Sequence, residues 1–233
     1  MSIYKDYIKE IKERKNRGLH PKPIDDGNLL SVIIEHIKDK DCTERESSLN
    51  FFIYNVIPGT TSAALIKAKF LKDIILKKFI IDEISSDYAF ELLSHMKGGP
   101  SVKALIDLLL DSNPNNAQSA ANILKTQVFL YDADMERLKN AYEDDNPYAK
   151  EVLISYSKAE FFTKLPEIEK EIKVVTYVAG IGDISTDFLS PGSDAHSRAD
   201  RELHGQSMFE HNIDKQNELL ALKEKHPDKI IML

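Results

Sequence analysis

The segment ISTDFLSPGSDAHSRAD, residues 184–200, is a dense polar stretch that follows the run IKVVTYVAG at residues 172–180. The earlier run is rich in β-branched residues and ends at a glycine, which is typical of a β-strand. It is the first convincing strand in a sequence that otherwise has the pattern of helices. We therefore expect the fold to change near residues 160–170, and the polar segment is the first candidate for a functional loop.

Upstream of this change, the apolar residues recur at spacings of three and four, in short blocks separated by glycine and proline. The blocks predict helices near residues 4–11, 29–37, 49–56, 63–76, 86–96, 102–110, 116–124, 135–142 and 148–162. None of them could bury its apolar face alone. This favours stacked helical pairs of the HEAT-like kind, with an irregular helical bundle as the alternative.

Two helix starts carry recognisable capping residues. Asp25 or Asp26 is placed to cap the block that begins near Leu29. Thr43 and Glu46 have the spacing of a capping box ahead of the next block. We expect each of these side chains to satisfy a free backbone N–H at the start of its helix.

Downstream of the polar segment, residues 214–225 predict one more helix and residues 229–233 a second strand. Strand, loop, helix and strand form the beginning of an α/β layer. A chain that ended naturally on this apolar strand would leave an exposed sheet edge, which proteins usually avoid. We therefore expect an N-terminal piece of a longer protein, mainly α, with a HEAT-like helical domain at 1–165 and the first part of an α/β domain at 166–233.

Composition excludes several classes of protein. With 42% hydrophobic and 30% charged residues in 233, the chain has the balance of a folded, soluble protein. It has no apolar run long enough for a membrane span and no leader-like start, so we expect a cytoplasmic protein. A single cysteine, Cys42, excludes an intramolecular disulfide and any metal cluster that needs several thiolates from this chain.

Several short motifs occur in the same order as in one bacterial enzyme family. They are LHPKPID at 19–25, MKGG at 96–99, LID at 105–107, NPYAK at 146–150, and a loop with Ser-Pro at 190–191 and Ser-Arg at 197–198. Taken together they resemble the aconitate hydratase B family, also called bifunctional aconitate hydratase 2 / 2-methylisocitrate dehydratase. The resemblance covers nearly the whole chain.

This resemblance implies an N-terminal HEAT-like domain, a swivelling β/β/α domain, and further α/β domains that carry a four-iron, four-sulfur cluster. It implies a hydro-lyase of the tricarboxylic acid cycle that interconverts citrate and isocitrate through cis-aconitate, with 2-methyl-cis-aconitate as a substrate of some members. The family's serine base and cluster cysteines would follow this chain. We therefore expect no catalytic residue and no bound cluster here, and no activity from the chain alone.

The site residues that the resemblance implies lie in the polar segment. Arg198 occupies the family's Ser-Arg position and is expected to bind a substrate carboxylate, since a planar guanidinium pairs with carboxylates in a bidentate manner. Asp187, Ser190 and Ser197 are expected to support it by shaping the loop. His204 matches a Leu-His that follows the family's arginine loop, in a role that could be structural.

No metal site is predicted from the histidines His20, His36, His95 and His204, because none pairs with another ligand at a recognised spacing. Cys42 is interpreted as an incidental thiol. Two residues depart from the family's usual pattern: Phe188 stands where many relatives have an acidic residue, and His196 stands where many have tryptophan. Both change the polarity around Arg198.

The helical half has competing interpretations. Stacked helices usually serve as docking surfaces, and the resemblance implies a homodimer formed through this domain. The resemblance also suggests RNA as a partner, and one basic run would suit it: Lys67, Lys69, Lys72, Lys77 and Lys78, opposed only by Asp73. The net charge of −7 argues weakly against nucleic acid. A stand-alone helical scaffold, possibly RNA-binding, is the alternative to an enzyme.

Overall fold

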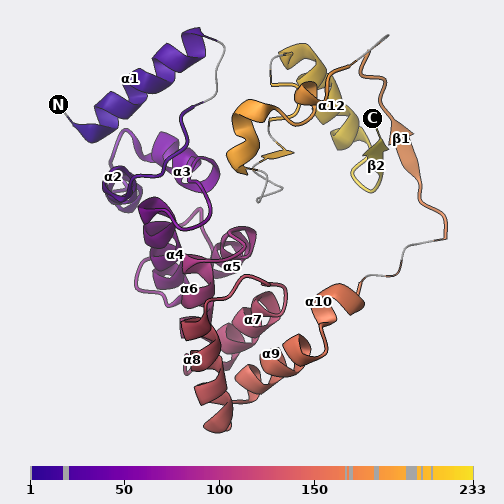
Figure 1. The fold of residues 1–233 in the computed structure, drawn as a ribbon. Coiled ribbons are helices and arrows are strands. Elements are labelled where there is room, and N and C mark those ends of the chain that lie inside the picture. The colour runs from indigo at the N-terminus through magenta and orange to yellow at the C-terminus, as the bar shows by residue number, and fades with distance from the viewer. Residues whose placement is uncertain are drawn as a thin grey trace. The chain divides into compact units, whose positions relative to one another are not determined.

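A computed structural model describes residues 2–17, 21–165, 167, 170–180, 184–197, 204–205, 207–210 and 212–232. The chain divides into two compact units, Met1–Leu165 and Pro166–Leu233. The first is helical and the second carries a two-stranded parallel sheet, so the prediction of a mainly helical fold followed by an α/β element is confirmed (Figure 1). No helix in the described part of the chain is long and apolar enough to cross a membrane.

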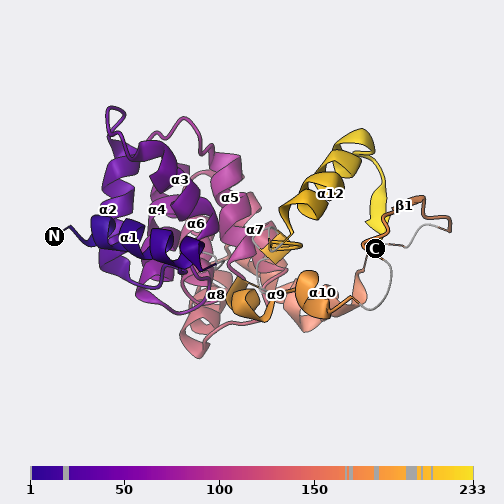
Figure 2. The same ribbon diagram turned by 90° about the horizontal axis from the view of Figure 1, so that it is seen from above.

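The first unit is a stack of short helices. Its elements are α1 (Ile3–Asn16), α2 (Gly27–Lys38), α3 (Arg45–Tyr54), α4 (Ser62–Ile75), α5 (Ser86–His95), α6 (Pro100–Leu109), α7 (Pro114–Leu124), α8 (Asp132–Glu143), α9 (Pro147–Ser157) and α10 (Glu160–Thr163). Helix α2 packs on α3 and α4, α4 packs on α5 and α6, and α6 packs on α7 and α8 (Figure 2). Helices α2, α4, α6 and α8 therefore follow one another in a row.

One continuous apolar core joins these helices. Fully buried side chains come from successive members of the stack, among them Ile33 on α2, Phe52 on α3, Leu71 on α4 and Leu105 on α6. Burying a side chain of this size stabilises the fold by about 1.5–3 kcal/mol. Since helices of this length are marginal alone, the shared core is what makes them stable.

Side chains cap five of the ten helices that the structure describes in the first unit. The Asp26 carboxylate accepts from the Asn28 N–H, which decides between the two residues considered for this cap. Thr61 caps α4, Ser85 caps α5, and Asn113 and Asn146 cap helices that begin with proline. Each cap satisfies a backbone donor that the helix itself leaves free.

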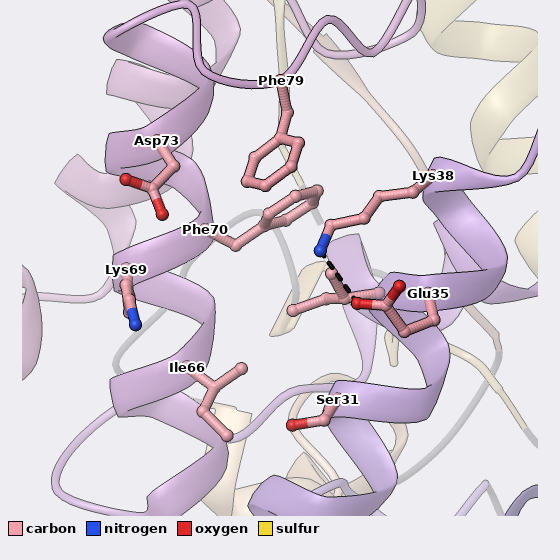
Figure 3. Close-up of a pocket in the computed structure, with 9 residues that line it drawn as sticks. Ser31, Glu35, Lys38, Ile66, Lys69, Phe70, Asp73 and Phe79 are labelled. Carbon is pink, nitrogen blue, oxygen red and sulfur yellow. Dashed lines mark hydrogen bonds and ion pairs between the residues drawn. The ribbon is translucent and has the colours of Figure 1, made fainter.

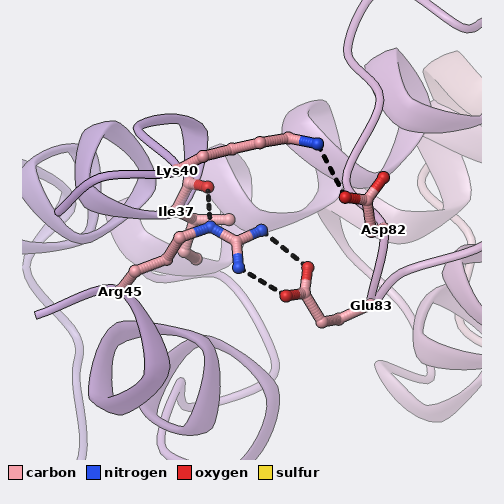
Figure 4. Close-up of polar contacts among 5 residues, drawn as sticks. All are labelled: Ile37, Lys40, Arg45, Asp82 and Glu83. Atoms are coloured by element: carbon pink, nitrogen blue, oxygen red, sulfur yellow. Dashed lines mark hydrogen bonds and ion pairs between the residues drawn. The ribbon is translucent and has the colours of Figure 1, made fainter. Parts of the chain in front are cut away.

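The predicted capping box at Thr43 and Glu46 is wrong. Helix α3 begins at Arg45, and no side chain caps it. The Arg45 side chain makes two long-range contacts at this start: its Nε donates to the Ile37 carbonyl at 3.0 Å, and its guanidinium pairs bidentately with Glu83, with one contact at 2.6 Å (Figure 4). The Arg45 side chain thereby links α3 to the end of α2 and to the loop before α5, which lies far along the chain.

The single helix predicted at 148–162 is two helices. Helix α9 ends at Ser157, and Ala159 adopts a left-handed conformation with φ of 50° before α10 begins. The Tyr156 hydroxyl donates to the Leu124 carbonyl at 2.7 Å, which holds the end of α9 against α7. The chain therefore turns at Ala159.

Asp107 on α6 links three helices. Its two carboxylate oxygens accept from Lys72 on α4 and from Arg137 on α8, each at 2.6 Å. Burial alone raises the pKa of the Asp107 carboxyl, but the hydrogen bonds from Lys72 and Arg137 outweigh it and hold that pKa below its usual value. The carboxylate is therefore a charged bridge across the row α4, α6 and α8.

The second unit contains β1 (Val174–Thr176) and β2 (Ile230–Met232), which pair in parallel with Val175 opposite Ile231. Helix α12 (Ile213–Lys225) precedes β2 and lies within the crossover that a parallel pair requires. Both strands are shorter than the predicted runs at 172–180 and 229–233.

We predict that Leu105→Ala lowers the free energy of unfolding by about 2–5 kcal/mol, because it empties a fully buried position. Leu65→Ala is the matched control: Leu65 is 53% exposed on α4, so its loss should cost less than about 0.5 kcal/mol. Urea denaturation of both variants measures the difference. Equal costs would contradict the assignment of the core.

We also predict that Asp107→Asn destabilises the chain by about 1–2 kcal/mol at pH 7, because it weakens the bonds to Lys72 and Arg137. The folded-state pKa of Asp107 is lowered, so its stabilisation is present above the unfolded pKa of about 3.9 and is lost as pH falls through the folded value. The gap between wild type and variant should therefore close below about pH 4. Asp41→Asn, at an exposed position, is the control; a gap independent of pH would contradict the role of the charge.

Candidate functional site

The polar segment of the second unit is a loop built from tight turns. A short 3₁₀ turn, η1 (Thr186–Phe188), opens it, and the Ser185 hydroxyl accepts from the Asp187 N–H at 3.2 Å. The Ser190 N–H then donates to the Thr186 carbonyl at 2.8 Å. A second 3₁₀ segment, η2 (Gly192–Ser197), follows. Serine hydroxyls that bond nearby backbone in this way favour turns over helix or strand.

Two side-chain pairs close the loop, and we call them the loop closure. Ser190 Oγ and His204 Nε2 share a hydrogen bond of 2.9 Å, and the Ser207 hydroxyl donates to the Asp194 carboxylate. Asp194 and Ser207 are 8% and 4% exposed, so their bond is sheltered from water. Two hydrogen bonds therefore link residues 190 and 194 to residues 204 and 207.

Phe209 fixes the loop closure to the rest of the unit. Its ring is buried and lies edge-to-face with Tyr177, with ring centroids 6.2 Å apart, and its N–H donates to the Phe188 carbonyl at 2.7 Å. Tyr177 in turn donates its N–H to Met232 and its hydroxyl to Glu218 on α12. The loop is thereby connected to both strands and to the helix.

The structure brings together some of the site residues expected from the sequence. Ser190 takes part in the loop closure with His204. Asp187 is exposed, and its carboxylate has no hydrogen-bond partner within the described part of the chain. Ser197 ends η2, and Arg198 lies outside the described residues. Asp194, Ser207 and Phe209 were not predicted from the sequence.

A separate pocket of about 360 Å³ lies between α2 and α4 in the first unit (Figure 3). Lys38 reaches into it, bonded to Glu35 at 2.8 Å and placed 4.4 Å from the centre of the Phe79 ring. The charge of Lys38 is thus balanced by a carboxylate and by an aromatic face. The Ser31 hydroxyl, which also lines the pocket, donates to the Gly27 carbonyl at 2.8 Å and not to a carboxylate.

The basic run on α4 and in the turn after it is not a free cationic face, and the expectation that only Asp73 opposes it is wrong. Lys67 is 4% exposed and donates to the Ile53 carbonyl at 3.0 Å. Lys72 is bonded to Asp107, and Lys78 to Asp73 at 2.9 Å. Asp107, which follows the run by many residues in sequence, therefore neutralises part of it.

The iron–sulfur cluster that the resemblance implies does not fit the residues of this chain. Cys42 is the single cysteine, and it is half-buried in the turn between α2 and α3. Within the described residues, no group of three or more histidine, cysteine, aspartate or glutamate side chains could hold a metal ion. A four-iron cluster needs several thiolates, so its ligands would have to come from another part of a longer protein.

Comparison with known proteins gives two family matches in order along the chain. Residues 6–162 match the aconitate B N-terminal domain, and residues 174–233 match the aconitate hydratase 2 N-terminus. Aconitate hydratase B of Salmonella typhimurium is 34% identical over 209 residues, which is 89% of this chain and 23% of that protein. The Helicobacter pylori protein of the same name is 34% identical over 221 residues, 94% of this chain and 25% of the relative.

The Escherichia coli protein gives the same picture, with 34% identity over 209 residues. The chain spans about a quarter of the length of these curated relatives. The first family match covers most of the helical unit, and the second covers most of the unit that contains the strands and the polar loop. The chain belongs to the aconitate hydratase B family and corresponds to its N-terminal region.

Proposed function

We propose that this chain is the N-terminal part of an aconitate hydratase that interconverts citrate and isocitrate through cis-aconitate in the tricarboxylic acid cycle. The observation that carries the proposal is the pair of family matches, in order, over both units. The chain spans about a quarter of its relatives, so the reaction is a property of the full-length protein. The chain alone is proposed to be inactive.

Within that protein, we propose that the loop at 184–210 presents Arg198 to a substrate carboxylate. A tricarboxylate needs several cationic contacts, and a guanidinium binds a carboxylate through two parallel hydrogen bonds. Arg198 follows Ser190 and Asp194 in sequence and precedes His204 and Ser207, so both bonds of the loop closure bracket it. Holding the two ends of a loop reduces the freedom that substrate binding must remove.

The supporting residues take different parts in this proposal. Ser190 and His204 restrain the loop through their hydrogen bond. Asp187 is exposed, so it is free to orient a neighbouring cation or a substrate hydroxyl. Ser197 directly precedes Arg198 and is proposed to shape the turn that carries it. No residue of this chain is assigned a proton transfer.

We also propose that the helical unit is a self-association surface of a homodimer. Phe161 and Phe162 lie edge-to-face with ring centroids 5.0 Å apart, and Phe162 is 67% exposed. Leu165 beside them is exposed as well. Exposed aromatic side chains are enriched at protein–protein interfaces, and stacked helices commonly serve as docking surfaces.

RNA binding by the helical unit is the second candidate, and the structure gives it less support. Several lysines of the basic run are engaged by Asp73, Asp107 and a backbone carbonyl. Phosphate contacts rely on clustered and available cations. A stand-alone helical scaffold remains the alternative if no catalytic domains accompany this chain.

We predict that Arg198→Lys in the full-length enzyme lowers kcat/KM for citrate by about 10- to 100-fold, because lysine cannot make the bidentate contact. Ser190→Ala should lower kcat/KM by a smaller factor, since it acts by restraining the loop. Arg17→Lys, in the helical unit, is the matched control and should leave the steady-state constants unchanged. Wild-type kinetics for Arg198→Lys would contradict the assigned role.

For the dimer, we predict that sedimentation equilibrium of the chain gives a mass that rises with concentration toward twice the chain mass. Phe162→Ser should weaken this association, because it removes an exposed ring from the aromatic pair. Ile80→Ser is the control: Ile80 is 78% exposed and belongs to the loop between α4 and α5. A monomeric mass at every concentration would contradict the proposed dimer.

A further inference from the structure

A second pocket of the helical unit, of about 160 Å³, lies between α4 and α6. We call it the lysine pocket. Its lining has an apolar part and a basic part, and the residues are Leu65, Ala68, Lys69, Lys72, Pro100, Lys103, Ala104 and Asp107. It lies wholly within the first unit and shares no residue with the polar loop of the second.

Small side chains make room for the pocket. Ala68 and Ala104 are 1% and 4% exposed, one on each of the two helices that form its walls. Pro100 begins α6, so the pocket also lies along the first turns of that helix. The apolar part of the lining suits a short carbon skeleton rather than a bare inorganic ion.

The rim of the lysine pocket has more positive than negative charge. Lys72 lies on it and is bonded to Asp107, which Arg137 also contacts from α8. One carboxylate therefore faces two cations. Lys69 and Lys103 are exposed, and neither has an ion-pair partner within the residues that the structure describes. The pocket lining therefore contains three lysines and one carboxylate, and Arg137 from outside the lining shares that carboxylate with Lys72.

The carboxylates on the neighbouring side do not cancel this excess. Lys69 also borders the pocket between α2 and α4, which contains Glu35 and Asp73. Glu35 is bonded to Lys38 at 2.8 Å, and Asp73 is bonded to Lys78 at 2.9 Å. Both carboxylates thus have their own cations, and the ammonium groups of Lys69 and Lys103 are left for a ligand.

We propose that the lysine pocket binds a small organic anion with two or more carboxylates. Its carbon skeleton would contact Leu65 and Pro100, with the buried Ala68 and Ala104 beneath it, and its carboxylates would contact Lys69, Lys72 and Lys103. Three lysine ammonium groups at separate positions can each contact a carboxylate that points in a different direction, whereas one planar guanidinium would contact a single carboxylate. The site goes beyond the proposed catalytic role and needs no residue of the polar loop.

Amide NMR of the 233-residue chain, titrated with sodium citrate against sodium chloride of equal ionic strength, tests the proposal. We expect saturable shifts centred on Ala68 and Ala104 with citrate and none with chloride. The double variant Lys69→Gln, Lys103→Gln should weaken binding by about tenfold, because it removes both available cations. Lys150→Gln, an exposed lysine on α9, should leave the affinity unchanged.

Four results would overturn the proposal. The first is an absence of saturable shifts at Ala68 and Ala104, and the second is wild-type affinity in the double variant. The third is equal affinity for inorganic phosphate, which would show that charge alone governs binding. The fourth is tighter binding of a single-stranded RNA oligonucleotide through the same lysines, which would make this a nucleic-acid surface. The readout is local to α4 and α6, so failure here leaves the proposed role of Arg198 untouched.

Discussion

The shared apolar core between successive helices is the constraint on which the first unit depends. Helices of this length are marginal in water by themselves, so each must bury one face on its neighbours. Leu71 on α4 and Leu105 on α6 are fully buried because those helices pack side by side. Polar links then fix the alignment: Arg45 joins α3 to Glu83, and Asp107 joins α4, α6 and α8. Displacing one helix would therefore break both kinds of contact.

Local sequence was sufficient to predict most of this unit, and distant partners explain where it was not. Apolar spacing located the helices, and capping residues such as Asp26 located several starts. The contact that Arg45 makes at the start of α3 was missed because Glu83 lies far along the chain. The basic run on α4 was misjudged for the same reason, since Asp107 comes from another helix. Ala159 carries no glycine or proline signal for the turn that it makes.

The candidate site was also predictable from the sequence only in part. The polar loop was recognisable from its composition and from the family resemblance, and the family matches over residues 6–162 and 174–233 support that recognition. The Asp194–Ser207 bond and the buried Phe209 were not predictable, because they depend on how the chain folds back on itself. Their effect is to hold the two ends of the loop that carries Arg198. The catalytic groups and cluster ligands of the family are proposed to lie in the rest of the protein.

The proposed role of Arg198 and its loop is tested most directly by a crystal structure of the full-length protein with citrate bound. We predict that the Arg198 guanidinium lies within hydrogen-bond distance of a citrate carboxylate, with the Ser190–His204 and Asp194–Ser207 bonds retained. Citrate bound at the catalytic centre without any contact to Arg198 would contradict the proposed role of the loop.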